Sequence, residues 1–250
     1  MDLRQFFQEH PKAALAFSGG ADSAYLLWAA RREGADAVPY FVSTPFQPAF
    51  ERADARRLAE ELGVSLRVVE VDVLTAPQVA DNPANRCYYC KKALFTALKC
   101  QAAADGCDTI IDGTNASDDA GDRPGMAALR ELEVLSPLRL CGLTKKDVRR
   151  LSRKAGLFTW DKPSYACLAT RFPAGRPITA EDLQRVEAGE AALMARGYRD
   201  LRLRLRGEGA LLQLPEVQME RARGEWKELE HLLAPWFDRV GLDDTPRKEE

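Results

Sequence analysis

One short stretch of the sequence combines glycines, hydroxyl groups and a carboxylate in a pattern that suits phosphate binding. The string Ser18-Gly19-Gly20-Ala21-Asp22-Ser23 follows the apolar segment 15–17 and precedes an expected helix. Glycine lets the backbone approach a ligand closely, and the first N–H groups of a helix bind anions. Ser18 and Ser23 can donate hydroxyl hydrogen bonds. A plain strand-to-helix turn uses the same residue types, and the lysine of a Walker loop is absent, so a phosphate site here would be of another kind.

Three cysteines stand where a thiol could react or bind a metal. Cys87 and Cys90 are three positions apart at the start of an expected helix, so their side chains face the same way. The chain has only two histidines and no second CxxC, which disfavours a structural zinc site. Cys167 lies in a proline-rich loop beside the positive charge of Arg171. Alternatively, Cys167 is a buried, unreactive side chain. We expect this structural role for the remaining cysteines, Cys100, Cys107 and Cys141.

A polar run follows the expected strand 109–111. It contains Asn115, Asp118, Asp122 and Arg123. Ligands of open α/β sheets bind at the carboxyl ends of the strands, so these side chains could hold magnesium or orient a substrate. An ordinary polar loop is the alternative, and the separate roles of the two acids stay open.

Arginines alternate with leucines in the segment 201–206. In a strand this spacing places Arg202, Arg204 and Arg206 on one face and the leucines on the other. Guanidinium groups bind phosphate and carboxylate in a forked geometry. A solvated strand face is the alternative.

The elements that position these residues alternate between strand and helix in the first part of the chain. We expect strands at 15–17, 37–42, 65–71 and 109–111, and helices at 22–33, 50–62, 91–104, 126–131 and 145–155. Such alternation predicts an α/β fold, with a Rossmann-like parallel sheet and helices on both of its faces.

The pattern changes at the proline-rich segment 158–178, which we interpret as a functional loop and a domain boundary. Thr179 is the expected N-cap of the next helix. Strands at 201–206 and 210–214 and a helix at 216–233 would then form a small α+β domain. We therefore expect two domains, at residues 1–165 and 166–250.

Composition limits the class of protein. The chain has 250 residues, of which 46% are hydrophobic and 30% charged, so it is neither disordered nor fibrous. Its net charge of −2 disfavours a binder of nucleic acid. No run approaches the roughly 18 apolar residues that span a bilayer, and the first apolar run is too short for a signal peptide. We expect a cytoplasmic protein with reduced cysteines.

The first string, SGGADS, resembles the PP-loop of the ATP pyrophosphatases. These enzymes adenylate a substrate, release pyrophosphate and let a nucleophile displace AMP. The resemblance implies an adenine nucleotide alpha hydrolase-like sheet and a site for ATP and Mg²⁺. It assigns the ATP phosphates to the loop and the adenine to the end of the second strand. The residues so implied are Ser18, Gly19, Gly20, Asp22, Ser23 and, at the second strand, Ser43.

Three further strings narrow the resemblance to one branch of this superfamily. They are Asn-Arg-Cys-Tyr-Tyr-Cys-Lys at 85–91, Asp-Gly-Thr-Asn-Ala-Ser-Asp at 112–118 and Ala-Cys-Leu-Ala-Thr-Arg at 166–171. Together they are similar to the LarE family, the ATP-dependent pyridinium-3,5-biscarboxylic acid mononucleotide sulfurtransferases of nickel-pincer cofactor synthesis. The resemblance covers nearly the whole chain. It implies adenylation of substrate carboxylates and their conversion to thiocarboxylates.

The same resemblance assigns the remaining roles. One form of the family sacrifices the sulfur of its loop cysteine, and another holds a [4Fe-4S] cluster on three cysteines, which aerobic purification can remove. Since this chain has Cys87, Cys90 and Cys167, we expect the cluster form, with Cys167 catalytic. The implied substrate ligands are Asn115, Asp118, Asp122, Arg123, Arg171, Glu190, Arg202 and Arg204.

Two other functions remain open from the sequence. A tRNA thiolase with a PP-loop and a [4Fe-4S] cluster would need an extended basic surface, and a non-catalytic nucleotide-binding regulator would lack turnover. The expected partner is a small nucleotide substrate, with neither membrane nor nucleic acid. The family resemblance implies a homo-oligomer, a hexamer. The sulfur donor is not identified by the sequence.

Overall fold

The computed structural model describes residues 1–118 and 124–247, and within them the chain divides into two compact units. The first unit contains residues 1–73 and 85–162, and the second contains Leu74–Ala84 and the chain from Pro163 onward. The first unit differs from the expected domain 1–165 in two respects, since 163–165 and, more notably, 74–84 belong to the second unit. Backbone hydrogen bonds are the reason.

The segment 74–84 is held by the proline-rich loop far along the chain. Gly175 N donates to Asn82 O at 2.8 Å, and Ile178 N donates to Ala80 O at 2.7 Å. The side-chain amide of Asn82 adds a bond to Pro173 O at 2.9 Å. Such non-local backbone pairing leaves no periodic pattern in the sequence.

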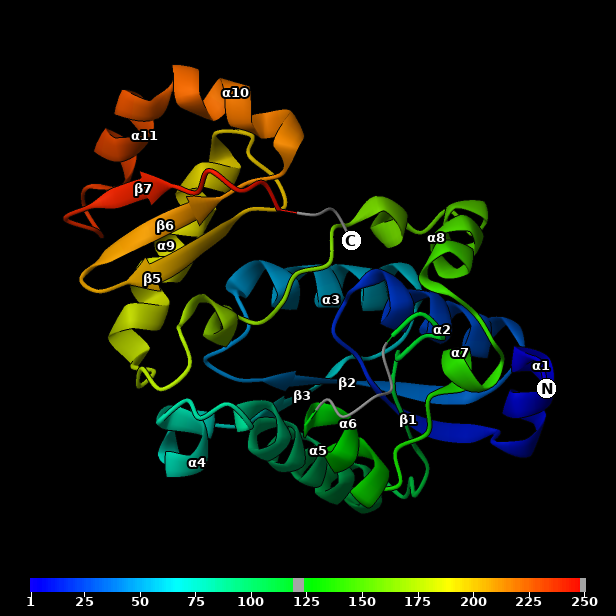
Figure 1. The fold of residues 1–250 in the computed structure, drawn as a ribbon. Coiled ribbons are helices and arrows are strands. Elements are labelled where there is room, and N and C mark those ends of the chain that lie inside the picture. The colour runs from blue at the N-terminus through cyan, green and yellow to red at the C-terminus, as the bar shows by residue number, and fades with distance from the viewer. Residues whose placement is uncertain (119–123, 248–250) are drawn as a thin grey trace. The chain divides into compact units, whose positions relative to one another are not determined.

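A four-stranded parallel sheet forms the centre of the first unit (Figure 1). Its strand order is β3-β2-β1-β4, and each pair is parallel. The sheet confirms the α/β fold expected from the alternation of strands and helices. Its strands are β1 (Lys12–Ala16), β2 (Asp36–Ser43), β3 (Arg67–Glu70) and β4 (Ile110–Ile111).

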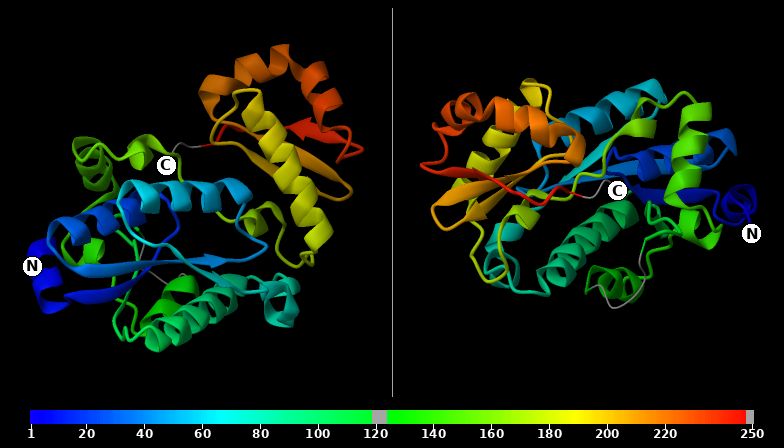
Figure 2. Two further views of the ribbon diagram at one scale, coloured as in Figure 1. Left: turned by 180° about the vertical axis from the view of Figure 1, so that it is seen from behind. Right: turned by 45° about the horizontal axis from the view of Figure 1, so that its top comes forward.

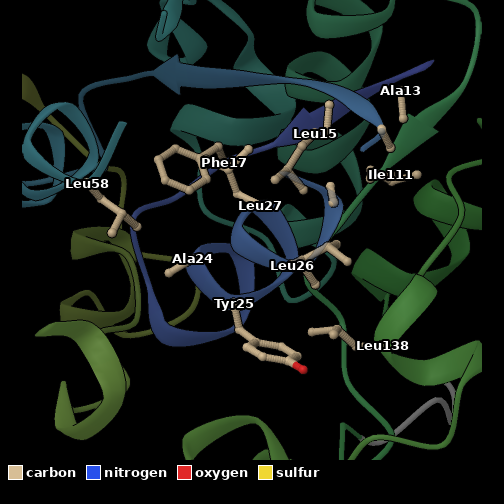
Figure 3. Packing of buried hydrophobic residues seen from close by; sticks show 14 of the residues in the cluster. Ala13, Leu15, Phe17, Ala24, Tyr25, Leu26, Leu27, Leu58, Ile111 and Leu138 are labelled. Carbon is tan, nitrogen blue, oxygen red and sulfur yellow. The ribbon is translucent and has the colours of Figure 1, made fainter. Parts of the chain in front are cut away.

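Helices cover both faces of this sheet, with α2 and α3 on one side and α5 on the other (Figures 1 and 2). Alternation along β1 explains the two faces, because Ala13 and Leu15 point to one side and Ala14 to the other. Leu15 belongs to one buried cluster with Leu26, Leu27 and Leu58, whose members Figure 3 shows. Ala14 belongs to a second cluster, together with Leu98 and Ala102 of α5. The helices of this unit are α1 (Leu3–Glu9), α2 (Ala21–Arg32), α3 (Ala49–Glu61), α5 (Arg86–Ala104), α6 (Pro124–Glu131), α7 (Pro137–Leu140) and α8 (Lys145–Lys154).

The second unit contains a three-stranded sheet of order β5-β6-β7. Strands β5 and β6 are antiparallel, and β7, which the sequence did not suggest, is parallel to β6. The expected single helix 216–233 is two helices that meet at Glu225, after Gly224. The elements are α4 (Pro77–Ala80), α9 (Ala180–Ala195), β5 (Arg202–Arg206), β6 (Gly209–Gln213), α10 (Glu216–Gly224), α11 (Trp226–Leu233) and β7 (Val240–Leu242).

Short 3-10 turns complete the chain, at Val73–Thr75, Phe158–Asp161 and Leu168–Arg171. None of the helices that the structure describes is long and apolar enough to cross a membrane. The cytoplasmic location and the hexameric state expected from the sequence stay predictions.

Candidate functional site

The loop 18–23 lies at the point of the sheet where the strand order reverses. From β1 the chain continues to β2 on one side, whereas β4 pairs with β1 on the other side. The carboxyl ends of β1 and β4 therefore flank a topological switch point, where open α/β sheets bind ligands. Asn115, which follows β4, donates its side-chain amide to Asp22 Oδ1 at 3.3 Å. The structure thus brings together two strings that the sequence singled out, at residues 18–23 and 112–118.

Close packing explains Gly19 in the loop and Gly113 after β4. Gly19 has a φ of +70°, and a Cβ there would lie 2.9 Å from Ala55 N. Gly113, which follows β4, approaches Ser23 so closely that a Cβ would lie 2.9 Å from its backbone nitrogen. Ser18 Oγ and Ser23 Oγ are 3.2 Å apart. The two glycines therefore let three chain segments converge around the start of α2.

The start of α2 offers groups of the kind that can bind an anion. The helix begins at Ala21 after Gly20, which has no side chain that could cap it. The first N–H groups of a helix have no partner within it, and here they face the same loop as the hydroxyls of Ser18 and Ser23. Asp22 stands in this first turn and is the one acid of the loop.

Hydrogen bonds hold the segment that follows β4. Asp118 Oδ2 accepts the backbone N–H of Asn115 at 2.8 Å, and Arg139 Nη2 donates to the backbone oxygen of Asp118. Asn115 is buried, while Asp118 is exposed. Asp122 and Arg123, which the sequence placed at the same site, lie outside the described residues.

The buried carboxylate of Asp112 holds the start of this segment. It accepts hydrogen bonds from Thr114 N at 3.1 Å, from Thr114 Oγ1 and from Ser136 Oγ at 2.7 Å. Ser43, expected near the adenine, ends β2, the neighbour of β1 in the sheet. Its contact with a nucleotide stays a prediction.

Two lysines that sequence reasoning missed lie against the loop. Lys145 Nζ forms an ion pair with Asp22 Oδ2. Lys162 Nζ lies 2.6 Å from Asp54 Oδ2 and 3.4 Å from Gly19 O. The Thr144 capping box at the start of α8 was a readable signal for a helix beginning at Lys145. No sequence signal places either ammonium group beside the loop, because that depends on the packing of α8 and on the turn that precedes Lys162.

Cys87 and Cys90 both stand in the first turns of α5, which begins at Arg86 rather than at residue 91. Cys87 is exposed and Cys90 is half-buried. Arg86 Nη2 lies 3.6 Å from Cys87 Sγ. Among the described residues there is no group of three or more His, Cys, Asp or Glu side chains that could hold a metal ion. Cys87 and Cys90 belong to the first unit and Cys167 to the second.

The loop that carries Cys167 is held by its own backbone and by Arg171. Cys167 is half-buried and precedes the turn Leu168–Arg171. Its carbonyl accepts bonds from Thr170 N at 3.0 Å and Thr170 Oγ1 at 2.9 Å. Arg171 Nη1 donates to Ala166 O at 2.8 Å. The position of the cysteine is therefore fixed from both sides.

Arg171 and Glu190 form a fully buried ion pair, with side chains 0% and 1% exposed. The pair is bidentate, at 2.7 Å for Nε and 2.9 Å for Nη2. Glu190 also accepts bonds from Tyr165 and from Leu203 N, the latter at 2.8 Å. Burial alone would lower the pKa of Arg171, but its bonds to Glu190 raise that pKa overall. In this structure both residues support the Cys167 loop, and their expected contact with a substrate stays a prediction.

Arg202 and Arg204 lie on one face of β5, as the alternation predicted. Arg202 is only 5% exposed. Within the described part of the chain, Arg202 Nη1 and Arg204 Nε are buried and have no hydrogen-bond acceptor. Burial, followed by the charge of Arg171, lowers the pKa of Arg202 to about 10. Arg202 Nη2 donates to Ser164 O at 3.5 Å. The charges of Glu190 and Asp200 offset only part of the lowering of the pKa of Arg202. A buried cation whose donors are incompletely paired is costly, so this face has properties that suit an anion.

The four-stranded parallel sheet, with the SGGADS loop at its switch point, agrees with the PP-loop fold that the sequence resembles. No family model matches the chain, but curated proteins do. The chain is 32% identical over 210 residues to the pyridinium-3,5-bisthiocarboxylic acid mononucleotide synthase of Lactiplantibacillus plantarum, covering 83% of this chain and 76% of the relative. The protein therefore belongs to the family of that synthase, the LarE family.

Other relatives agree with this placement. An uncharacterized protein of Synechocystis is 38% identical over 220 residues, which cover 88% of this chain and 82% of the relative. The tRNA-specific 2-thiouridylase MnmA of Pseudothermotoga lettingae is 26% identical over 187 residues, or 60% of this chain and 54% of the relative. The second similarity fits the wider PP-loop superfamily.

Proposed function

We propose that the protein is an ATP-dependent sulfurtransferase that adenylates the carboxylates of pyridinium-3,5-biscarboxylic acid mononucleotide and converts them to thiocarboxylates in nickel-pincer cofactor synthesis. The main support is the 32% identity to a synthase named for the bisthiocarboxylic product. The loop at the switch point supports the ATP half of the reaction. The thiol of Cys167, on its fixed loop, supports the sulfur half.

Adenylation makes a carboxylate reactive, because AMP is a far better leaving group than oxide. In the proposed step a substrate carboxylate oxygen attacks the α-phosphorus of ATP, and the bond to the β-phosphate oxygen breaks. Pyrophosphate departs with the electron pair. The N–H groups at the start of α2 and the hydroxyls of Ser18 and Ser23 would bind the phosphate oxygens. Lys145 and Lys162 add positive charge beside the same loop.

The residues of the loop also suit Mg²⁺. Asp22 offers a carboxylate that is 20% exposed, beside the serine hydroxyls of the same loop, and Mg²⁺ prefers such oxygen ligands together with substrate phosphates. We propose Asp22 as the protein ligand of the metal. A bound Mg²⁺ would neutralise charge on the phosphates as pyrophosphate leaves.

For the sulfur step we propose that Cys87, Cys90 and Cys167 provide thiolates to a [4Fe-4S] cluster. Thiolates are the usual ligands of such clusters, and the spacing of Cys87 and Cys90 on the first turns of α5 lets one face of the helix supply two of them. A bound cluster would supply an open iron able to carry sulfide. The alternative is that Cys167 itself gives up its sulfur, and the cluster content decides between them.

The arginines of β5 are the proposed site for the substrate phosphate. Burying the incompletely paired charge of Arg202 costs folding free energy, and Arg202→Met removes this cost. In phosphate-free buffer the variant should therefore melt at a higher temperature, by about 2–4 °C for each kcal/mol of folding free energy gained. Added phosphate should stabilise the wild type by mass action and leave the variant unchanged. Arg206→Met, an exposed position on the same strand, is the control. A variant that still gains stability from phosphate would contradict this assignment.

The function itself is tested with the purified protein, ATP, Mg²⁺ and the biscarboxylic mononucleotide. We expect pyrophosphate release that depends on the mononucleotide and a product in which sulfur replaces carboxylate oxygen, seen by mass spectrometry. Pyrophosphate release without any sulfur-containing product, under anaerobic conditions with intact thiols, would contradict sulfur transfer.

The similarity to a tRNA 2-thiouridylase supports a second candidate function, thiolation of tRNA. Thiolation of tRNA would need tight, salt-dependent binding of RNA, for which a net charge of −2 is unfavourable. A gel shift with tRNA across a salt titration separates the two functions. The hexameric state remains a proposal from the family resemblance.

A further inference from the structure

Asp22 is already paired with an ammonium group from a distant part of the chain. Lys145 Nζ contacts Oδ2, while the amide of Asn115 donates to Oδ1 at 3.3 Å. Both oxygens of the carboxylate thus have a protein partner. A divalent cation that binds Asp22 must take one of these oxygens, and only Oδ2 is held by a group that a cation would repel.

The pair is partly buried, so a counter-ion stabilises the charged form of Asp22. The side chain of Asp22 is 20% exposed and that of Lys145 is 26% exposed. An ionised carboxylate with this little water around it needs a positive neighbour. Lys145 can supply that charge before a metal arrives, and a metal can replace it afterwards.

The backbone of Lys145 is fixed while its side chain can change partners. Its N–H donates to Ser117 Oγ at 3.0 Å, and the capping box of Thr144 and Asp147 fixes the start of α8. The flexible four-carbon stem of lysine leaves the ammonium group free to move. Lys162 differs, because Asp54 and the carbonyl of Gly19 both hold its ammonium group, at 2.6 and 3.4 Å.

We propose that Lys145 is an exchangeable counter-ion of the phosphate-binding loop. It neutralises Asp22 until Mg²⁺ takes Oδ2, and its ammonium group then binds the oxygens of the pyrophosphate at the same loop. Both charged groups stay paired through this exchange. Asp22 pairs with the metal in place of Lys145, and Lys145 pairs with the phosphate in place of Asp22. The inference rests on the proposed function, because it takes pyrophosphate as the leaving group.

The proposal predicts opposite effects of Lys145→Met on two ligands. Without a competing ammonium group, Mn²⁺ alone should bind several-fold tighter, as measured by its electron paramagnetic resonance signal. Pyrophosphate in the presence of Mg²⁺ should bind about tenfold more weakly, as measured by calorimetry, because one charge-assisted hydrogen bond is lost. Lys145→Arg should restore most of the pyrophosphate affinity. Lys146→Met, at the exposed neighbouring position, is the matched control and should change neither affinity.

A double-mutant cycle ties the metal effect to the carboxylate. In an Asp22→Asn background, Lys145→Met should no longer tighten Mn²⁺ binding. Weakening of both ligands by Lys145→Met would mean that Lys145 only supports the loop, and unchanged affinities would mean that it is no counter-ion; either result overturns the proposal. A wild type that binds Mn²⁺ but no pyrophosphate would instead contradict the proposed adenylation, and with it the phosphate half of the exchange.

Discussion

Replacing Cys167 with alanine is expected to abolish formation of the thiocarboxylate while ATP-dependent pyrophosphate release continues. The reason is that the two half-reactions are proposed to use residues from different parts of the chain. The groups proposed to bind ATP belong to the first unit, at the start of α2, whereas Cys167 belongs to a separately held loop of the second unit. Loss of one thiol leaves the phosphate-binding groups unchanged. The acyl adenylate should then form and meet no sulfur nucleophile.

The measurement follows pyrophosphate and sulfur-containing product in parallel, in anaerobically purified protein. Cys100→Ala makes the same chemical change at an exposed position of α5 and should leave both readouts at wild-type level. A Cys167→Ala variant that still forms the thiocarboxylate at the wild-type rate would show that this thiol is neither the sulfur donor nor needed to hold one.

Iron content distinguishes the two routes for sulfur. With a cluster, wild type should contain close to four irons and four labile sulfides per chain, and Cys87→Ala, Cys90→Ala and Cys167→Ala should each reduce both. Iron-free protein that thiolates its substrate once per chain would instead identify Cys167 as a sacrificial donor. In that case Cys87→Ala and Cys90→Ala should retain the single turnover.

The alternation of strand and helix patterns was sufficient to predict the parallel sheet, and the contiguous string 18–23 was sufficient to predict a loop between β1 and α2. The loop could be predicted because its residues are contiguous and its position after β1 follows from the strand pattern. The approach of Asn115 to Asp22 could be expected as well, since both follow strands that end at the same edge of the sheet.

Groups that converge from separate elements could not be predicted in the same way. Lys145 and Lys162 carry no motif, and only the packing of the elements around α2 places them beside the loop. The segment 74–84 joins the second unit through backbone bonds that any sequence could make. Arg171 and Glu190 were expected at the substrate because of the family strings, and their complete burial against each other became visible only in three dimensions.

Glu190→Gln is expected to destabilise the second unit by about 3–5 kcal/mol, the usual cost of leaving a buried charge without its partner. The variant keeps the shape of the side chain, and its amide oxygen can still accept from Leu203 N. It loses the negative charge that the bidentate contact with Arg171 requires. Urea unfolding measures the change in free energy. Glu225→Gln is the control in the same unit, because its pair with Arg221 is 36–45% exposed and should contribute at most about 0.5 kcal/mol.

The same substitution also tests whether the pair positions Cys167. Arg171 reaches the carbonyls of Ala166 and Cys167 through Nη1, at 2.8 and 3.5 Å, while Glu190 holds the opposite edge of the guanidinium. Below the melting temperature of the variant, hydrogen exchange should therefore increase in residues 164–171. Sulfur transfer should fall while pyrophosphate release stays near the wild-type rate. A variant that is as stable as Glu225→Gln, with unchanged exchange in this loop, would contradict the positioning role and return Arg171 and Glu190 to the candidates for direct substrate contact.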